Sequence, residues 1–277
     1  CSRRGIVSES RGAVLVALVM AAVVALAIVF PTTSERPTQL VTESAAPATS
    51  AESGNAPFTA LQKNDIRNTV REYLLDNPQV IVEAIEALQA RQQQSQQQQN
   101  HGAIAANMEQ LVNTRRDPFI GNPDASVTVV EFFDYQCPYC KRMAQDLAKI
   151  ATEDPDVKII FKEFPVFGRE STMATRAALA SAKQGKYAEF HLAIMGLRGA
   201  PSENALFRIA SRLGMDLDRL RRDMQSPSIE TQIQTNLQLA RQVGVRGTPA
   251  FIVGDQLVPG AMSPDQMRQL IAEKRGS

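Results

Sequence analysis

The stretch "EFFDYQCPYC" (131–140) holds two of the chain's three cysteines, separated by a proline and a tyrosine. It begins inside a β-branched and aromatic run, "VTVVEFF" (127–133), which predicts a buried strand. A helix is expected to start at the pair, with Cys137 at its N-cap and Cys140 one turn inside. The spacing alone is compatible with a metal clamp, a structural staple or a redox centre, so the surrounding sequence has to decide.

A strand followed by Cys-x-x-Cys at a helix start favours the redox centre. Unpaired backbone N–H groups and the helix dipole stabilise negative charge there, so we expect a lowered pKa for Cys137. Cys140 can then attack a mixed disulfide on Cys137 and release the substrate. The spacing therefore predicts one exposed nucleophile and one sheltered resolving thiol. A passive structural disulfide, the alternative, would close so short a loop that it would restrict the unfolded chain very little.

Composition argues against several other classes of protein. The 277 residues include 30 Lys and Arg and 29 Asp and Glu, a net charge of +1 that gives no electrostatic case for nucleic-acid binding. Three cysteines are too few for a disulfide-stapled scaffold. A zinc site would need two further ligands, and both histidines, His101 and His191, are expected to be solvated or packed instead. We predict no metal site and no cofactor, and we assign no function to Cys1.

Residues 1–30 are predicted to be a membrane anchor or a signal sequence. Residues 12–30 are uncharged and almost wholly apolar, and about 20 such residues span a bilayer. Three arginines precede this segment, which places the amino end in the cytoplasm and everything after residue 30 outside. The alternatives are an uncleaved inner-membrane anchor, favoured by the length of the apolar run, and a signal peptide cleaved near Ala25-Leu26-Ala27.

Residues 31–57 and 58–113 are predicted to be a disordered linker and a helical stalk. The linker is rich in Pro, Ser, Thr, Ala and Glu and has too few apolar residues to fold. In the stalk, Asn77-Pro78 closes one amphipathic helix and opens a second, with Asn77 as its N-cap. The second helix runs into a tract of low complexity, "RQQQSQQQQN" (91–100), that is compatible with helix.

Apolar stripes on the stalk need a surface to cover them. They either dock on the chain's own globular domain or associate with other copies of the chain into a homo-oligomer, and periodicity does not decide between the two. The stripes consist of Ile66, Val70, Tyr73, Leu74, Ile81, Ile85 and Leu88 before the glutamine tract and of Ile104, Met108 and Leu111 after it.

Residues 114–277 are predicted to form the globular domain. The order of its elements is βαβ, a helical block and then ββα, which predicts an α/β domain with a mixed sheet. After the cysteine helix we expect a strand over 157–164, helices only over about 170–243, a hairpin of 250–253 and 256–258, and a final helix from Ser263 to Lys274.

Two further elements are candidates for the site. Glu131 alternates with Val130 and Phe132 and faces the other side of its strand. It lies either beneath the helix start, where burial would raise its pKa and let it take the proton from Cys140, or at an edge as an ordinary glutamate. Thr248-Pro249 precedes a strand, and a cis Pro249 would leave the Thr248 backbone free to pair with an extended peptide. The alternative is a trans proline that only starts a strand.

These segments resemble the DsbA-like thiol–disulfide oxidoreductases. The matching stretches are "EFFDYQCPYC" (131–140), "FKEFPVFG" (161–168) and "GVRGTPAFIV" (244–253), within a likeness that covers about residues 117–275. The resemblance implies a thioredoxin-like fold with an inserted all-helical subdomain. In the stalk, "YLLDNPQVIVEAIEALQ" (73–89) resembles the suppressor-of-copper-sensitivity C proteins, some of which form a trimer that acts as a disulfide isomerase.

The resemblance also implies the roles of the site residues. Tyr139 stands where strongly oxidising members carry a histidine that can stabilise the thiolate, which argues against a very oxidising potential. The implied site has Cys137 as nucleophile, Cys140 as resolving thiol, Glu131 as proton relay, Thr248 with a cis Pro249 as substrate rest, and Pro138 and Tyr139 as further substrate contacts.

We therefore expect a periplasmic thiol–disulfide oxidoreductase, either an oxidase or an isomerase. Its substrates would be unfolded or misoxidised cysteine-containing proteins, and its membrane redox partner would be quinone-linked for an oxidase or a reductant for an isomerase. Two alternatives stay open. The tetrad Cys-Pro-Tyr-Cys is also that of glutathione-linked, glutaredoxin-like reductases, and soft thiolates can bind Cu(I) in a copper-handling protein.

Overall fold

The computed structural model describes residues 58–275. The predicted anchor or signal sequence (1–30), with its first cysteine, and the predicted linker (31–57) lie outside the described residues. Within the described range, none of the helices combines the length and the apolar character needed to cross a membrane. By their contacts, the described residues from Ile66 onward form one compact unit, which holds the whole sheet and the cysteine pair.

A five-stranded mixed sheet forms the centre of the domain, with the strand order β1-β3-β2-β4-β5. β2 and β3 run parallel, and the other neighbouring pairs run antiparallel. This arrangement confirms the predicted βαβ unit, the hairpin and the mixed sheet. The strands are β1 (Phe119–Gly121), β2 (Val127–Phe133), β3 (Val157–Glu163), β4 (Ala250–Val253) and β5 (Gln256–Pro259).

The sequence does not predict β1, because three residues are too few to show alternation. β1 pairs antiparallel with β3 at one edge of the sheet. Gly121 ends this strand with φ +91°, and a Cβ atom there would lie 2.3 Å from the Val157 carbonyl oxygen. A glycine is required both by the positive φ and by this close approach to β3.

One face of the sheet is covered by α4 (Pro138–Glu153) and α10 (Pro264–Lys274), which also contact each other. α10 begins as predicted, because Ser263 caps it in a capping box with Gln266. α4 buries a stripe at helical spacing that holds the helix, and therefore the cysteine pair, against the sheet, where its main contacts are with β1 and β3. The buried residues of α4 are Cys140, Met143, Ala144, Leu147, Ile150 and Ala151.

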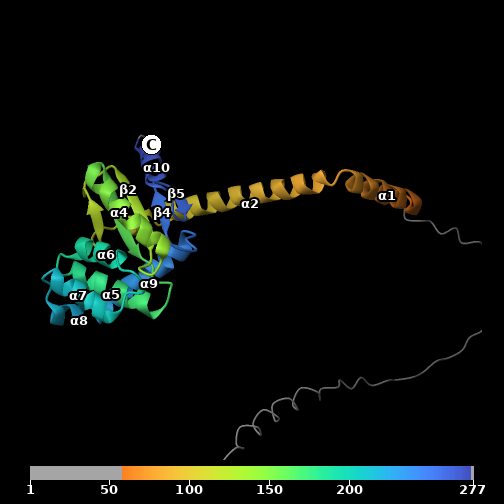
Figure 1. Ribbon diagram of the computed structural model, residues 1–277. Coiled ribbons are helices and arrows are strands. Elements are labelled where there is room, and N and C mark those ends of the chain that lie inside the picture. The colour runs from red at the N-terminus through yellow and green to blue at the C-terminus, as the bar shows by residue number, and fades with distance from the viewer. Residues whose placement is uncertain (1–57, 276–277) are drawn as a thin grey trace, which may run out of the picture. The chain divides into compact units, whose positions relative to one another are not determined.

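The predicted helical insertion is present as a group of mutually contacting helices beside α4 and the sheet (Figure 1). α9 differs from the rest, because its first half contacts α5 and its last turns pack on the sheet face opposite α4. The insertion therefore ends inside the core rather than as a separate lobe. Its helices are α5 (Arg169–Ala182), α6 (Tyr187–Met195), α7 (Glu203–Arg212), α8 (Leu217–Asp223) and α9 (Pro227–Gln242).

The stalk consists of α1 (Ala60–Asp76), α2 (Gln79–Ala106) and the short α3 (Met108–Leu111). Ile104 and Leu111 are fully buried against Phe132, Ile160 and neighbouring apolar residues. Complete burial of such a side chain contributes roughly 1.5–3 kcal/mol. The end of α2 is therefore docked on the chain's own domain.

The stripes before the glutamine tract are not covered in this way. Among the described residues they stay exposed, with side chains about half accessible to solvent, so docking on the chain's own domain is confirmed only for the end of the stalk. The exposed stripe residues are Ile66, Val70, Tyr73, Ile81, Ile85 and Leu88.

The prediction that Asn77 caps α2 is wrong. Pro78 occupies the cap position of α2 and makes no side-chain capping hydrogen bond. The Asn77 side-chain amide instead donates to the Tyr73 carbonyl oxygen at 2.9 Å, so it satisfies an acceptor at the end of α1. The Asn77 side-chain oxygen accepts from the Gln79 side-chain amide at 3.4 Å rather than from a backbone N–H of α2.

Candidate redox site

The cysteine pair sits at the start of α4. Cys137 is the N-cap residue, with φ −66° and ψ 115°, and the backbone N–H of Cys140 donates to its Sγ at 3.4 Å. Pro138 opens the helix, where the missing N–H costs nothing. Both cysteines are free thiols. The predicted positions of both residues on the helix are therefore confirmed.

The pKa of Cys137 is lowered from 9.0 to about 5, in the predicted direction. The largest cause is the hydrogen bond from the Cys140 thiol, and smaller contributions come from the backbone amides of Cys140 and Tyr139; burial opposes all of them. The sequence argument placed the helix amides first, whereas the neighbouring thiol contributes more. The resolving cysteine thus also activates the nucleophile.

A Cys140→Ala substitution should therefore raise the pKa of Cys137 from about 5 towards 9.0. The thiolate absorbance of the reduced variant, followed against pH, measures this shift directly. The direction of the shift also determines how stability depends on pH. Because the pKa of Cys137 is lowered on folding, the shift stabilises the reduced protein fully above pH 9.0, and this stabilisation is lost as pH falls towards 5. An unchanged titration in the variant would contradict the role of the Cys140 thiol.

The prediction of an exposed nucleophile is wrong in this structure. Cys137 is only 1% exposed, and Cys140 is fully buried. The reason is a segment distant in sequence: the Cys137 thiol donates to the Thr248 carbonyl oxygen at 3.3 Å, so the loop before β4 lies against the sulfur. Pro138 and Tyr139 stay exposed beside it, and the Arg142 guanidinium lies 4.3 Å from the centre of the Tyr139 ring.

Glu131 lies on the same face of β2 as Phe133, the face covered by α4. Of its two predicted placements, the buried one is correct, since Glu131 is 1% exposed. Burial is the largest cause that raises its pKa to about 8, followed by the charges of Cys137 and Glu163. Its Oε1 atom has no hydrogen-bond partner among the described residues. The pKa of Cys140 is raised as well. Burial is the largest cause, followed by the hydrogen bond to Cys137 and the charge of Glu131.

The Thr248-Pro249 peptide bond is cis, as one of the two predicted alternatives has it. β4 begins directly afterwards, with Ala250 between Phe132 on β2 and Pro259 on β5. The Thr248 hydroxyl is buried and has no hydrogen-bond partner among the described residues. Thr248, which follows Cys137 by 111 residues, thus lies next to the nucleophilic sulfur.

Residues 128–272 match the family described as "DSBA-like thioredoxin domain". The chain belongs to this family. Residues 62–95 match a second family, "Copper resistance protein ScsC N-terminal domain". The chain thus has the fold of DsbA-like thiol–disulfide oxidoreductases, preceded by an ScsC-type helical region, as the resemblance in the sequence implies.

Solved structures of related proteins agree with this assignment. A thioredoxin-like oxidoreductase from Silicibacter pomeroyi is 41% identical, with a TM-score of 0.59, and the match covers 61% of this chain and 98% of that one. ScsC from Proteus mirabilis in a transitional conformation is 32% identical, with a TM-score of 0.59, covering 79% of this chain and 99% of that one.

The curated relatives match part of the chain. The Na(+)/H(+) antiporter NhaA 3 of Salinispora tropica is 31% identical over 144 residues, which are 51% of this chain and 22% of the antiporter. The chain thus spans about a fifth of the length of that relative. Disulfide bond formation protein D of Bacillus subtilis is 26% identical over 175 residues, covering 57% of this chain and 76% of that protein.

Sequence reasoning about this DsbA-like chain missed Asp134 and Gln136. The Asp134 carboxylate accepts hydrogen bonds from the backbone N–H groups of Val166 and Phe167, at 2.7 and 3.0 Å, and from the Ser171 hydroxyl at 2.6 Å. The Gln136 amide donates to the Phe167 carbonyl oxygen at 2.9 Å. These bonds fix the loop after β3 beside the cysteines. The signal was an Asp directly after a strand, a residue that commonly caps turns.

A buried polar cluster around Glu163 was also missed. Its carboxylate accepts hydrogen bonds from the hydroxyls of Tyr135 at 3.2 Å, Tyr187 at 2.9 Å and Thr175 at 3.0 Å. Burial nevertheless raises the pKa of Glu163 to about 8. His191 lies next to Tyr135, with 3.0 Å between Nδ1 and the hydroxyl, and burial lowers its pKa to about 3. His191 is therefore packed and neutral, as expected.

The other histidine behaves differently. His101 is exposed, and its Nδ1 lies 3.2 Å from a carboxylate oxygen of Asp255. Across the described part of the chain, no group of three or more His, Cys, Asp or Glu side chains is arranged to hold a metal ion.

Proposed function

We propose that the chain exchanges disulfides with cysteine-containing proteins outside the cytoplasm, through Cys137 and Cys140. The observation that carries this proposal is the setting of the Cys137 sulfur. It lies at a helix N-terminus, 3.4 Å from the Cys140 amide nitrogen and 3.3 Å from the Thr248 carbonyl oxygen, with a pKa lowered to about 5. A thiol of this kind is ionised at neutral pH and is a good attacking and leaving group.

The exchange proceeds through a mixed disulfide. The Cys137 thiolate attacks one sulfur of a client disulfide, an S–S bond to Cys137 forms, and the other client sulfur leaves as a thiolate. In isomerisation a different client thiolate then attacks the mixed disulfide and restores Cys137, with no net electron transfer. In the escape route the Cys140 sulfur attacks Cys137 instead, after its proton passes to Glu131. The bond between Cys137 and the client breaks, a Cys137–Cys140 disulfide forms, and the client leaves reduced by two electrons.

Among the described residues, the exposed stripes of the stalk favour the isomerase over the oxidase. About half of each of the Ile81, Ile85 and Leu88 side chains is accessible, and three such residues at helical spacing on one face favour contact with another helix. A second copy of the chain, with the same stripe, supplies it. Such an oligomer holds several thiols around one client, and a membrane reductant would keep them reduced.

The proposal is tested by supplying two clients to the reduced and oxidised protein. Recovery of activity from a client with scrambled disulfides, together with a multimeric mass in solution, supports the isomerase. Oxidation of a fully reduced client by a monomer would instead support the oxidase, with a quinone-linked partner. Failure to exchange with either client would overturn thiol–disulfide exchange itself.

An Ile85→Asp substitution should dissociate the oligomer and lower isomerisation about tenfold, because a charge in an apolar helix contact is costly. Oxidation of a reduced client, which needs one active site, should change less than twofold. Ala90→Asp introduces the same charge on the opposite face of α2 and is the control. Light scattering and the two client assays measure these effects, and an Ile85→Asp protein of unchanged mass would contradict the proposed contact.

A further inference from the structure

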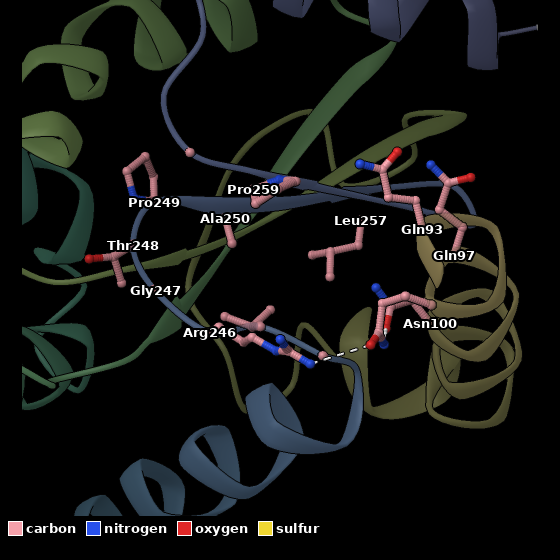
Figure 2. A pocket seen from close by; sticks show the side chains of 14 residues that line it. Gln93, Gln97, Asn100, Arg246, Gly247, Thr248, Pro249, Ala250, Leu257 and Pro259 are labelled. Carbon is pink, nitrogen blue, oxygen red and sulfur yellow. Dashed lines mark hydrogen bonds between the residues drawn. The ribbon is translucent and has the colours of Figure 1, made fainter. Parts of the chain in front are cut away.

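A pocket of about 490 Å³ lies between α2 and the segment that leads into β4 (Figure 2). We name it the amide pocket and define it by Gln93, Gln97, Asn100, Thr248, Pro249 and Leu257. Its volume falls in the range of about 300–1,000 Å³ that is common for ligand sites. One wall comes from the stalk and the other from the catalytic domain.

The stalk wall is the glutamine tract, to which the sequence assigns no role. Gln93, Gln97 and Asn100 follow one another by four and three residues, so they share one face of α2. Figure 2 shows the three side chains on the helix at one side of the pocket. The low-complexity tract therefore presents a row of amides to the site.

Three contacts hold this wall in place. The Gln96 amide donates to the Asn100 side-chain oxygen at 2.9 Å, and the Arg246 guanidinium donates to the Gln96 side-chain oxygen at 3.3 Å. Gly244 has φ +85°, and a Cβ atom there would lie 2.4 Å from the Asn100 side-chain oxygen. Glycine thus permits α2 to approach the loop, and Ile104, one turn further on, is buried in the core.

The opposite wall reaches the nucleophile. Thr248 lines the pocket, and its carbonyl oxygen lies 3.3 Å from the Cys137 sulfur. A client segment bonded to Cys137 through its cysteine would therefore lie next to Thr248, at the edge of the amide pocket.

The lining fits one chemical class. Glutamine and asparagine amides donate and accept hydrogen bonds as a peptide backbone does, and Pro249 and Leu257 supply apolar surface. Arg246 is the charged residue of the lining, and it bonds to Gln96. Such a surface binds extended, uncharged polypeptide with little regard to sequence, whereas a small thiol is too short to reach it.

We propose that the amide pocket binds the segment of an unfolded client that flanks the cysteine joined to Cys137, with Gln93 and Gln97 as hydrogen-bonding partners of its backbone. This inference rests on the proposed exchange function and names the client class for it. It also makes the stalk helix part of the client site.

The test replaces the side-chain amides of Gln93 and Gln97 by carboxylates. Reduced full-length protein is mixed with unfolded peptides that carry one internal disulfide flanked by Ser, Lys or Glu, and the rate of first attack is measured. In the Gln93→Glu/Gln97→Glu variant the Lys peptide should react about tenfold faster than the Glu peptide, whereas the wild type should separate them less than threefold. The Gln94→Glu/Gln98→Glu variant is the control, with the same charges and spacing on side chains that do not line the pocket.

A second substrate separates this inference from the function on which it rests. Hydroxyethyl disulfide is too small to reach α2, so both variants should reduce it at the wild-type rate. If the pocket variant and the control discriminate between the peptides equally, the amide pocket is not the client site. If the wild type fails to react with hydroxyethyl disulfide and with every peptide, the exchange function falls as well.

Discussion

A Cys140→Ser variant is expected to accumulate as a stable mixed disulfide with its client, bonded through Cys137. The serine hydroxyl can still donate to the Cys137 sulfur, which keeps much of the thiolate stabilisation that the Cys140 thiol supplies. It cannot attack the mixed disulfide, so release of a reduced client depends on thiols from solution. Loss of the intramolecular attack should slow single-client reduction by at least about 100-fold.

The matched variant is Cys137→Ala, which removes the attacking sulfur and leaves Cys140 buried with a raised pKa. It should form no mixed disulfide, and its exchange rate should fall by about a thousandfold or more. Non-reducing electrophoresis and intact-protein mass spectrometry distinguish the two variants. Trapping by Cys137→Ala in place of Cys140→Ser would reverse the assigned roles of the two cysteines.

The start of α4 could be predicted from sequence because all its determinants are local. Cys137 at the N-cap, Pro138 next to it and the apolar stripe of the helix lie within a few turns of each other. The alternation of side chains along β2 likewise placed Glu131 on one face of the strand, although the sequence did not indicate that α4 would cover that face. Local patterns thus located the pair and one of its neighbours.

The cover over the nucleophile could not be predicted in the same way. Cys137 and Thr248 are separated by 111 residues, and their contact depends on how β4 pairs with β2. The glutamine tract carries no apolar period, so nothing in it indicates that Asn100 meets Gly244. The burial of Glu163 could have been predicted, because it lies two residues after the buried Phe161 on the same face of the strand. Its hydroxyl partners could not, because they come from three other segments.

Glu131→Gln is expected to slow the attack of Cys140 on the mixed disulfide by about 100-fold, the usual contribution of a positioned general base. Only ionised Glu131 can take the proton, so the wild-type resolution rate should rise with pH through the pKa of Glu131. In the mixed disulfide this pKa lies above 4.5 but below about 8, because burial still raises it while the charge of Cys137 is absent. The glutamine variant should lose this inflection and keep its first attack on the client. Stopped-flow measurement of mixed-disulfide decay against pH separates the two steps.

The pH dependence of stability tests the raised pKa of Glu131 independently. The pKa of Glu131 is raised on folding from 4.5 to about 8, so the native state holds a proton that the unfolded chain releases between these values. Stability is therefore lost as pH rises from 4.5 to 8, by up to about 1.4 kcal/mol per pH unit, and Glu131→Gln should remove this loss. Denaturant unfolding of the two reduced proteins at several pH values measures it.

Glu163→Gln is the matched control, because Glu163 is an equally buried carboxyl with a pKa of about 8 on the neighbouring strand. Its charge raises the pKa of Glu131, so its removal should move the inflection in the resolution rate to lower pH without abolishing it. Both variants should therefore relieve the loss of stability at high pH, and only Glu131→Gln should abolish base catalysis. If Glu163→Gln removed the inflection and Glu131→Gln kept it, the proton would leave Cys140 through the Glu163 cluster instead.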